Sequence, residues 1–85
     1  MREDDFEVYL RNTNLSENTI ASYKFAVKQY FAQFDTVTQK KLRDHKMWLI
    51  ESYKPKTVNL RIRAINCYLD SIGKGEWKLQ FVKVQ

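Results

Sequence analysis

The segment from Tyr53 to Gly73, which includes Pro55, sets the strongest constraint on how this chain folds. Proline does not continue a preceding helix, Thr57 is a favourable N-cap residue, and glycine is favoured just beyond a helix end. Large aliphatic side chains between these residues recur at spacings of four and three on one narrow face, at Val58, Ile62, Ile65, Leu69 and Ile72. This pattern predicts one long helix with a stripe that packs into a core.

The other sides of this helix differ in composition from an ordinary solvent-exposed surface. Leu60, Ala64 and Cys67 lie nearly opposite the stripe, which predicts a second contact surface. The fully polar strip is narrow, and it consists of Asn59, Arg63, Asn66 and Asp70. The start of the helix is cationic, with Lys54, Lys56, Arg61 and Arg63 and no acidic residue between Glu51 and Asp70. A cationic helix start with open amides favours phosphate binding.

Two helices are expected in the first part of the chain. Asp4 or Asp5 caps a short helix, and residues 11–14 form a loop. Ser16 caps a longer helix that runs to about Phe34. The inward faces are Phe6, Tyr9 and Leu10 in the first helix, and Ile20, Tyr23, Val27, Tyr30, Phe31 and Phe34 in the second. Helical periodicity explains these aromatic residues as core.

A third helix is expected to begin after Thr38, its N-cap, and to run to about Tyr53. Its inward residues are predicted to be Leu42, Leu49, Ile50 and Tyr53, widened by Met47 and Trp48. His45 flanks this apolar face, and no second ligand or nucleophile is nearby. We therefore expect His45 to be structural or solvated, without a catalytic role.

After Gly73 the chain changes character. Trp77, Leu79 and Phe81 alternate with polar residues as in a strand, but no partner strand is expected in the chain. The alternatives are an extended tail that lays Trp77 back on the helices, or the beginning of a connection to another domain.

Composition limits the class of protein. The chain has 85 residues, of which 44% are hydrophobic, enough for one small domain. One cysteine and one histidine exclude an internal disulfide and a zinc cluster. The acidic N-terminus and the short apolar runs predict a cytoplasmic protein that is neither exported nor embedded in a membrane. The net charge of +5 is concentrated in residues 18–63, with ten bases and three acids, and this field favours a polyanionic partner.

Two segments resemble a known family. LSENTIASY at 15–23 opens one helix, and KTVNLRIRAI at 56–65 opens another about 38 residues later. They are similar to the Ser-x-x-Thr-aliphatic-x-x-Tyr and Thr-aliphatic-Asn patterns of the core-binding domain of tyrosine recombinases, also called the SAM-like N-terminal domain of phage integrases. The resemblance covers nearly the whole chain. It implies an all-α, four- to five-helix orthogonal bundle over residues 1–76, with an extended tail at 77–85 that leads to a separate catalytic domain.

By this resemblance, the domain forms half of a clamp around duplex DNA at a recombination core site, in a bacterial or phage setting at the nucleoid. The other implied partners are the catalytic domain of the same parent chain and further recombinase protomers in a tetrameric synapse. No cofactor is implied. The implied DNA-contacting residues are Asn18, Thr19, Ser22, Phe25 and Lys28 in the second helix, and Lys54, Lys56, Thr57, Leu60 and Arg61 in the last.

Three residues depart from the family pattern at positions that affect DNA reading. Leu60 and Ala64 stand where the family commonly has a polar residue, and Ala21 replaces what is often a longer side chain. We therefore expect phosphate contacts to supply most of the affinity, and Leu60 or Phe25 to touch a thymine methyl group. Phe25 lies well away from the core stripe of its helix, so it is predicted to be exposed or to meet a partner.

The family's catalytic set of arginines, lysine, histidines and tyrosine does not occur in this chain. The five tyrosines lie on or beside predicted core faces without an arginine cluster, so no strand cleavage by these residues is expected. A rival interpretation is a protein-interaction domain with a docking patch formed by Phe25, Leu60, Ala64 and Cys67. A basic helical bundle without a role in nucleic-acid binding is the third possibility.

Overall fold

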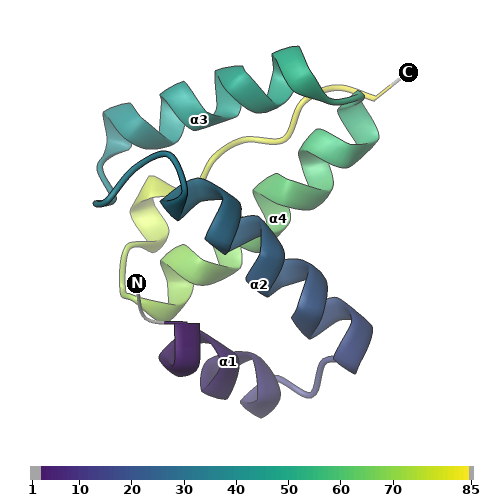
Figure 1. The fold of residues 1–85 in the computed structure, drawn as a ribbon, viewed down its shortest axis with the longest axis vertical. Coiled ribbons are helices and arrows are strands. Elements are labelled where there is room, and N and C mark those ends of the chain that lie inside the picture. The colour runs from purple at the N-terminus through teal and green to yellow at the C-terminus, as the bar shows by residue number, and fades with distance from the viewer. Residues whose placement is uncertain (1–2, 85) are drawn as a thin grey trace.

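The structure is a computed structural model, and it describes residues 3–84 (Figure 1). The described residues contain helices and no strand, which confirms the all-α prediction. None of these helices has both the length and the apolar character needed to cross a bilayer. The elements are α1 (Glu3–Asn12), α2 (Glu17–Phe31), α3 (Gln39–Ser52), α4 (Pro55–Ser71) and a short 3₁₀ helix, η1 (Gly75–Trp77).

α4 is the central helix, and α1, α2, α3 and η1 all pack against it (Figure 1). Four residues of its predicted stripe, Val58, Ile62, Ile65 and Leu69, are buried. Ile65 and Leu69 join buried residues of α1 and α2 and Leu42 of α3 in one cluster. Val58 and Ile62 pack with Leu49 of α3 in a second cluster. The aliphatic periodicity therefore identified the face that holds the domain together.

The stripe prediction was wrong at its last residue, because Ile72 is exposed. α4 ends at Ser71, and the C-cap Ile72 has φ −107° and ψ 11°, so its side chain leaves the helical face. Gly73 follows with φ +75°, as predicted for a residue just past a helix end. Its N–H bonds the Asp70 carbonyl at 3.2 Å, and the Lys74 N–H bonds the Leu69 carbonyl at 2.8 Å, which completes a Schellman motif.

The helix starts confirm two of the predicted caps. The Ser16 and Thr38 hydroxyl oxygens accept from the backbone N–H groups of Thr19 and Lys41 at 3.2 and 3.1 Å. The predicted cap at Thr57 was wrong, since α4 begins at Pro55 with Lys54 as its N-cap. Proline suits the first helical position because its fixed φ is helical and that N–H has no intrahelical partner in any case. Thr57 therefore lies inside the first turn.

Other predicted boundaries shift by a few residues. α1 begins at Glu3, so Asp4 and Asp5 lie within the helix and do not cap it, and it runs to Asn12. α2 ends at Phe31. The predicted inward faces of both helices hold, with Phe6, Leu10, Ile20, Val27 and Tyr30 buried and Tyr9, Tyr23, Phe31 and Phe34 packed against them.

α3 differs from its predicted orientation. Its buried line is Leu42, His45 and Leu49, so the helix presents His45 to the core. Ile50 lies one residue beyond Leu49, about 100° around the helix, and is exposed, contrary to the prediction. Met47, which was expected to widen the apolar side, is exposed as well.

The chain after η1 is extended and lies between α3 and α4 (Figure 1). Asn66 donates to the Leu79 carbonyl at 2.9 Å and accepts from the Leu79 N–H at 2.8 Å. Asn59 makes the same pair of bonds with Val82, at 2.9 and 2.8 Å. Residues seven apart on a helix are about 10.5 Å apart, close to the span of three extended residues. Two side-chain amides thus replace the partner strand that the tail lacks, and Trp77 packs on the core as one alternative expected.

Candidate functional site

The packing of α2 against α4 brings together residues that the family resemblance assigned to DNA. Ala21, Ser22 and Phe25 from α2 and Leu60 and Arg61 from α4 line one surface hollow of about 280 Å³. Phe25 is exposed, as predicted, and so is Leu60. Four residues of the predicted set therefore lie at one place, although the two from α2 precede the two from α4 by 35 or more positions along the sequence.

Arg61 is held in this hollow by three neighbours. Its guanidinium carbon lies 4.8 Å from the ring centroid of Phe25 and 5.1 Å from that of Tyr53. Its Nη1 donates to Gln29 Oε1 at 3.2 Å, and Gln29 Nε2 donates to the Tyr53 hydroxyl at 2.9 Å. Stacking and one amide fix the position of the guanidinium, and its remaining N–H donors make no hydrogen bond within residues 3–84 and can meet a ligand.

A second group of cations gathers at the start of α4. Lys54 and Lys56 are exposed, and with Pro55, Lys83 and Val84 they line a hollow of about 510 Å³. The tail brings Lys83 to this point, which sequence reasoning missed. Its position depends on the two asparagine contacts that hold the tail against α4.

The start of α4 leaves backbone donors open. Lys54 makes no side-chain cap, and the first turn contains no acidic residue. The Val58 N–H bonds the Lys54 carbonyl at 3.0 Å, so the amides of Lys56 and Thr57 precede the first intrahelical bond. Such amides, together with the positive end of the helix dipole, favour an anion.

The other predicted residues extend the same surface along α2. Asn18, Ser22 and Lys28 are exposed, and Lys28 lies one turn beyond Phe25. Thr19 is partly buried and its hydroxyl accepts from Ser16 Oγ at 2.9 Å, so this hydroxyl already serves the helix cap. Thr57 is also partly buried.

The ion pairs of the described residues leave this surface uncompensated. Acidic side chains pair elsewhere, as in Arg11 with Glu7 at 2.9 Å and Lys78 with Asp70 at 2.8 Å. The Lys24 ammonium and the Arg11 guanidinium hold the pKa of the Glu7 carboxyl below its usual range. Within residues 3–84, no carboxylate oxygen lies within 4.0 Å of the charged groups of Lys28, Lys54, Lys56 and Arg61.

The docking patch of the rival interpretation is smaller than expected. Ala64 is buried, and Cys67 is partly buried and packs against the core, where burial raises the pKa of its thiol. The rival interpretation was wrong to place both at the surface. Their packing on the side opposite the stripe agrees with the second contact surface predicted for this helix, because α4 contacts α1, α2, α3 and η1. Of that patch, Phe25 and Leu60 remain exposed.

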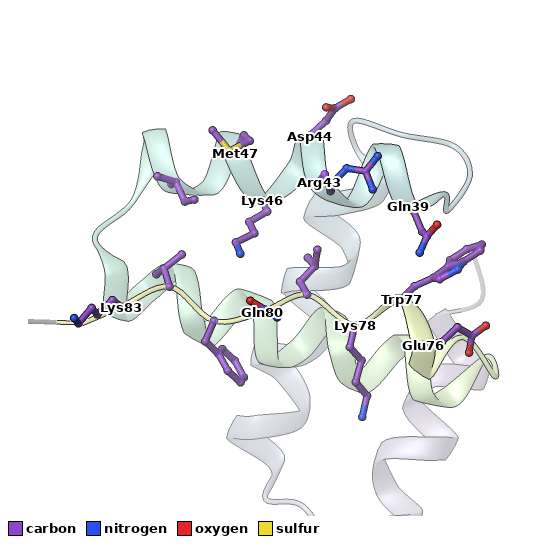
Figure 2. Close-up of a pocket in the computed structure, with 14 residues that line it drawn as sticks. Gln39, Arg43, Asp44, Lys46, Met47, Glu76, Trp77, Lys78, Gln80 and Lys83 are labelled. Atoms are coloured by element: carbon purple, nitrogen blue, oxygen red, sulfur yellow. The ribbon is translucent and has the colours of Figure 1, made fainter.

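A larger hollow of about 890 Å³ lies between α3 and the tail (Figure 2). Figure 2 shows Lys46 directed from α3 toward the tail across this groove. It contains none of the predicted DNA-contacting residues. The groove carries charges of both signs, namely Arg43, Lys46, Lys78 and Lys83 with Asp44 and Glu76. Among the described residues, no group of three or more His, Cys, Asp or Glu side chains is arranged to hold a metal ion.

His45 is buried on the core side of α3, with its ring against Tyr30 and Trp48. Its Nδ1 lies 3.2 Å from Gln33 Oε1 and its ring stacks on Trp48 at 5.6 Å, whereas Nε2 finds no hydrogen-bond partner among residues 3–84. Burial lowers the pKa of its imidazole to about 4, so the ring is neutral at pH 7. It is a core residue, one of the two alternatives expected for it.

Comparison with protein family models, with curated proteins and with solved structures finds no match to this chain.

Proposed function

We propose that this domain binds duplex DNA through the face formed by α2 and the first turns of α4. The observation that carries the proposal is the meeting of Phe25, Leu60 and Arg61 across the two helices, beside cations that no carboxylate of residues 3–84 pairs with. A polyanion would supply the missing negative charge, and its affinity would come mainly from the release of counterions.

This face, called the α2–α4 face below, offers two kinds of contact to DNA. Lys54, Lys56 and the open amides at the start of α4 are suited to phosphate oxygens, because they combine mobile cations with fixed backbone donors. Arg61 and the exposed positions of α2 are suited to a groove, since rigid side chains on a helix can enter the major groove of duplex DNA. Phosphate contacts would position the domain, and groove contacts would read the base edges.

Within this proposal, the domain is the core-binding half of a tyrosine recombinase clamp. The support is the pair of motifs at 15–23 and 56–65, whose first helical turns both border the α2–α4 face. The four described helices would then correspond to the SAM-like bundle of that family. Catalysis would belong to a separate domain of the parent chain, and the assembled enzyme would act as a tetramer at the nucleoid.

The proposal is tested by titrating a fluorescently labelled duplex at several salt concentrations. We expect affinity to fall steeply with salt, and Lys56→Ala to reduce the magnitude of the log–log slope by about 0.9. Lys40→Ala is the matched control, because it removes the same charge from an exposed lysine at the start of α3, paired with Asp44. The absence of binding even at low salt, or equal effects of the two variants, would overturn the proposal.

The exposed Phe25 and Leu60 also support a second candidate, the docking of another protein molecule on the same face. Sedimentation distinguishes the two, because a docking surface gives Phe25-dependent association without DNA. A monomer that sediments faster only after duplex is added would favour DNA binding.

A further inference from the structure

The hollow between α2 and α4 has an unusual lining for a surface that meets a polyanion. Three of its five residues are apolar, namely Ala21, Phe25 and Leu60, and only Ser22 and Arg61 are polar. Phe25 is 55% exposed and Leu60 is 48% exposed. Charged phosphate oxygens offer little to these side chains, so the apolar lining suits a different partner group.

Duplex DNA presents one projecting apolar group in its major groove, the 5-methyl group of thymine. Apart from flat C–H edges such as cytosine C5–H, the other major-groove groups on the base edges are hydrogen-bond donors or acceptors. If the α2–α4 face lies on the major groove, contact with a thymine methyl is therefore the way for Phe25 and Leu60 to lose water without facing an unpaired polar group. Protein side chains commonly make apolar contact with this methyl group.

The shape of the site favours receiving a group over inserting one. Side chains that pry base steps apart protrude as wedges. Here the Phe25 ring is covered by the Arg61 guanidinium at 4.8 Å, and the space of about 280 Å³ lies between the two helices. A hollow of this kind accepts a projecting methyl group, and the adjacent Arg61 donors can meet an acceptor on a neighbouring base edge or phosphate.

We propose that Ala21, Phe25 and Leu60 form a socket for a thymine 5-methyl group, so that one position of the bound DNA is read by apolar contact. This inference rests on the proposed function and goes further, because it names the group that the hollow recognises and the residues that discriminate. Lys54 and Lys56 contribute affinity that does not depend on sequence, whereas the socket contributes preference.

The test exchanges thymine for deoxyuridine, which removes only the methyl group. A preferred duplex is first selected from a random-sequence library with the wild-type protein. Each thymine of that duplex is then replaced in turn by deoxyuridine, and affinity is measured by fluorescence anisotropy. We expect one replacement to weaken binding about three- to fivefold, the change expected for one buried methyl group, and the others to have little effect.

Protein variants connect the effect to the socket. Leu60→Ala should bind the thymine and deoxyuridine duplexes equally, and Ala21→Leu should do the same by filling the space. Lys56→Ala is the control, since it should weaken both duplexes by the same factor. Ala21 and Leu60 are both exposed, so these two substitutions should leave the fold intact, and far-ultraviolet circular dichroism checks this.

Two failures can be told apart. If the protein binds duplex DNA but no deoxyuridine replacement changes its affinity, or if Leu60→Ala and Ala21→Leu keep the full discrimination, the socket is wrong and the DNA-binding proposal stands. If the protein binds no duplex at low salt, the proposed function is wrong and the socket falls with it.

Discussion

Asn66→Ala should loosen the C-terminal tail from α4. The substitution removes both bonds between the Asn66 amide and the backbone of Leu79. A typical intramolecular hydrogen bond contributes about 0.5–1.5 kcal/mol net, so two bonds correspond to about 1–3 kcal/mol. Asn66 and Leu79 are only partly buried, and water can replace part of the loss, so we expect a value near the lower end.

The double variant Asn59→Ala/Asn66→Ala should cost more than either single change. Without both amides, Leu79 and Val82 lose the anchors that hold them against Leu49, Val58 and Ile62. We expect the free energy of unfolding to fall by about 2–4 kcal/mol in urea titrations. Amide hydrogen exchange should show the cause directly, because the N–H groups of Leu79 and Val82 bond to these side chains and should lose protection.

Gln80→Ala is the control for this experiment. Gln80 is exposed on the same tail between the two anchored residues, so its replacement should change stability by less than about 0.5 kcal/mol. The reasoning would be refuted if the double variant unfolded at the same urea concentration as the wild type and kept the exchange protection of the tail amides.

Three further predictions concern stability in urea titrations. Ser16→Ala should cost about 1 kcal/mol, because the Thr19 N–H loses its cap; an unchanged midpoint would contradict this. Gly73→Ala should cost about 1–2 kcal/mol, because its φ of +75° is unfavourable for alanine; equal stability would show that the backbone relaxes. Burial lowers the pKa of His45 from 6.5 to about 4, so between these pH values the unfolded chain binds a proton that the folded protein does not. The free energy of unfolding should therefore fall by about 3 kcal/mol as the pH is lowered from 6.5 to 4, and this fall should be absent in His45→Gln. Equal pH dependence in both proteins would contradict the prediction.

Much of the fold followed from local pattern. The stripe of α4 and the aromatic face of α2 were predictable because a helix that buries one side repeats its apolar residues every three or four positions. The caps at Ser16 and Thr38 were predictable because each hydroxyl serves an amide only three residues away. At the start of α4 two local signals competed, and Pro55 at the first helical position prevailed over Thr57.

What could not be predicted depends on how distant segments meet. Asn59 and Asn66 were identified as a polar strip, but their bonds to the tail join residues 23 and 13 positions apart, and no periodicity encodes that. The exposure of Phe25 was predictable from its angle on the helix. The cation–π contacts of Arg61 with Phe25 and Tyr53 were not predictable. They require α2 to cross α4 and the turn between α3 and α4 to place Tyr53 beside them.

The central claim, that duplex DNA binds on the α2–α4 face, is tested most directly by a nuclear magnetic resonance titration of the ¹⁵N-labelled protein with a short duplex at low salt. We expect the backbone amides of Ser22, Phe25, Lys56, Leu60 and Arg61 to shift together and to return when salt is raised. Amides of α1 and the middle of α3 should stay in place. Shifts confined to the groove between α3 and the tail, or no shifts at all, would contradict the account.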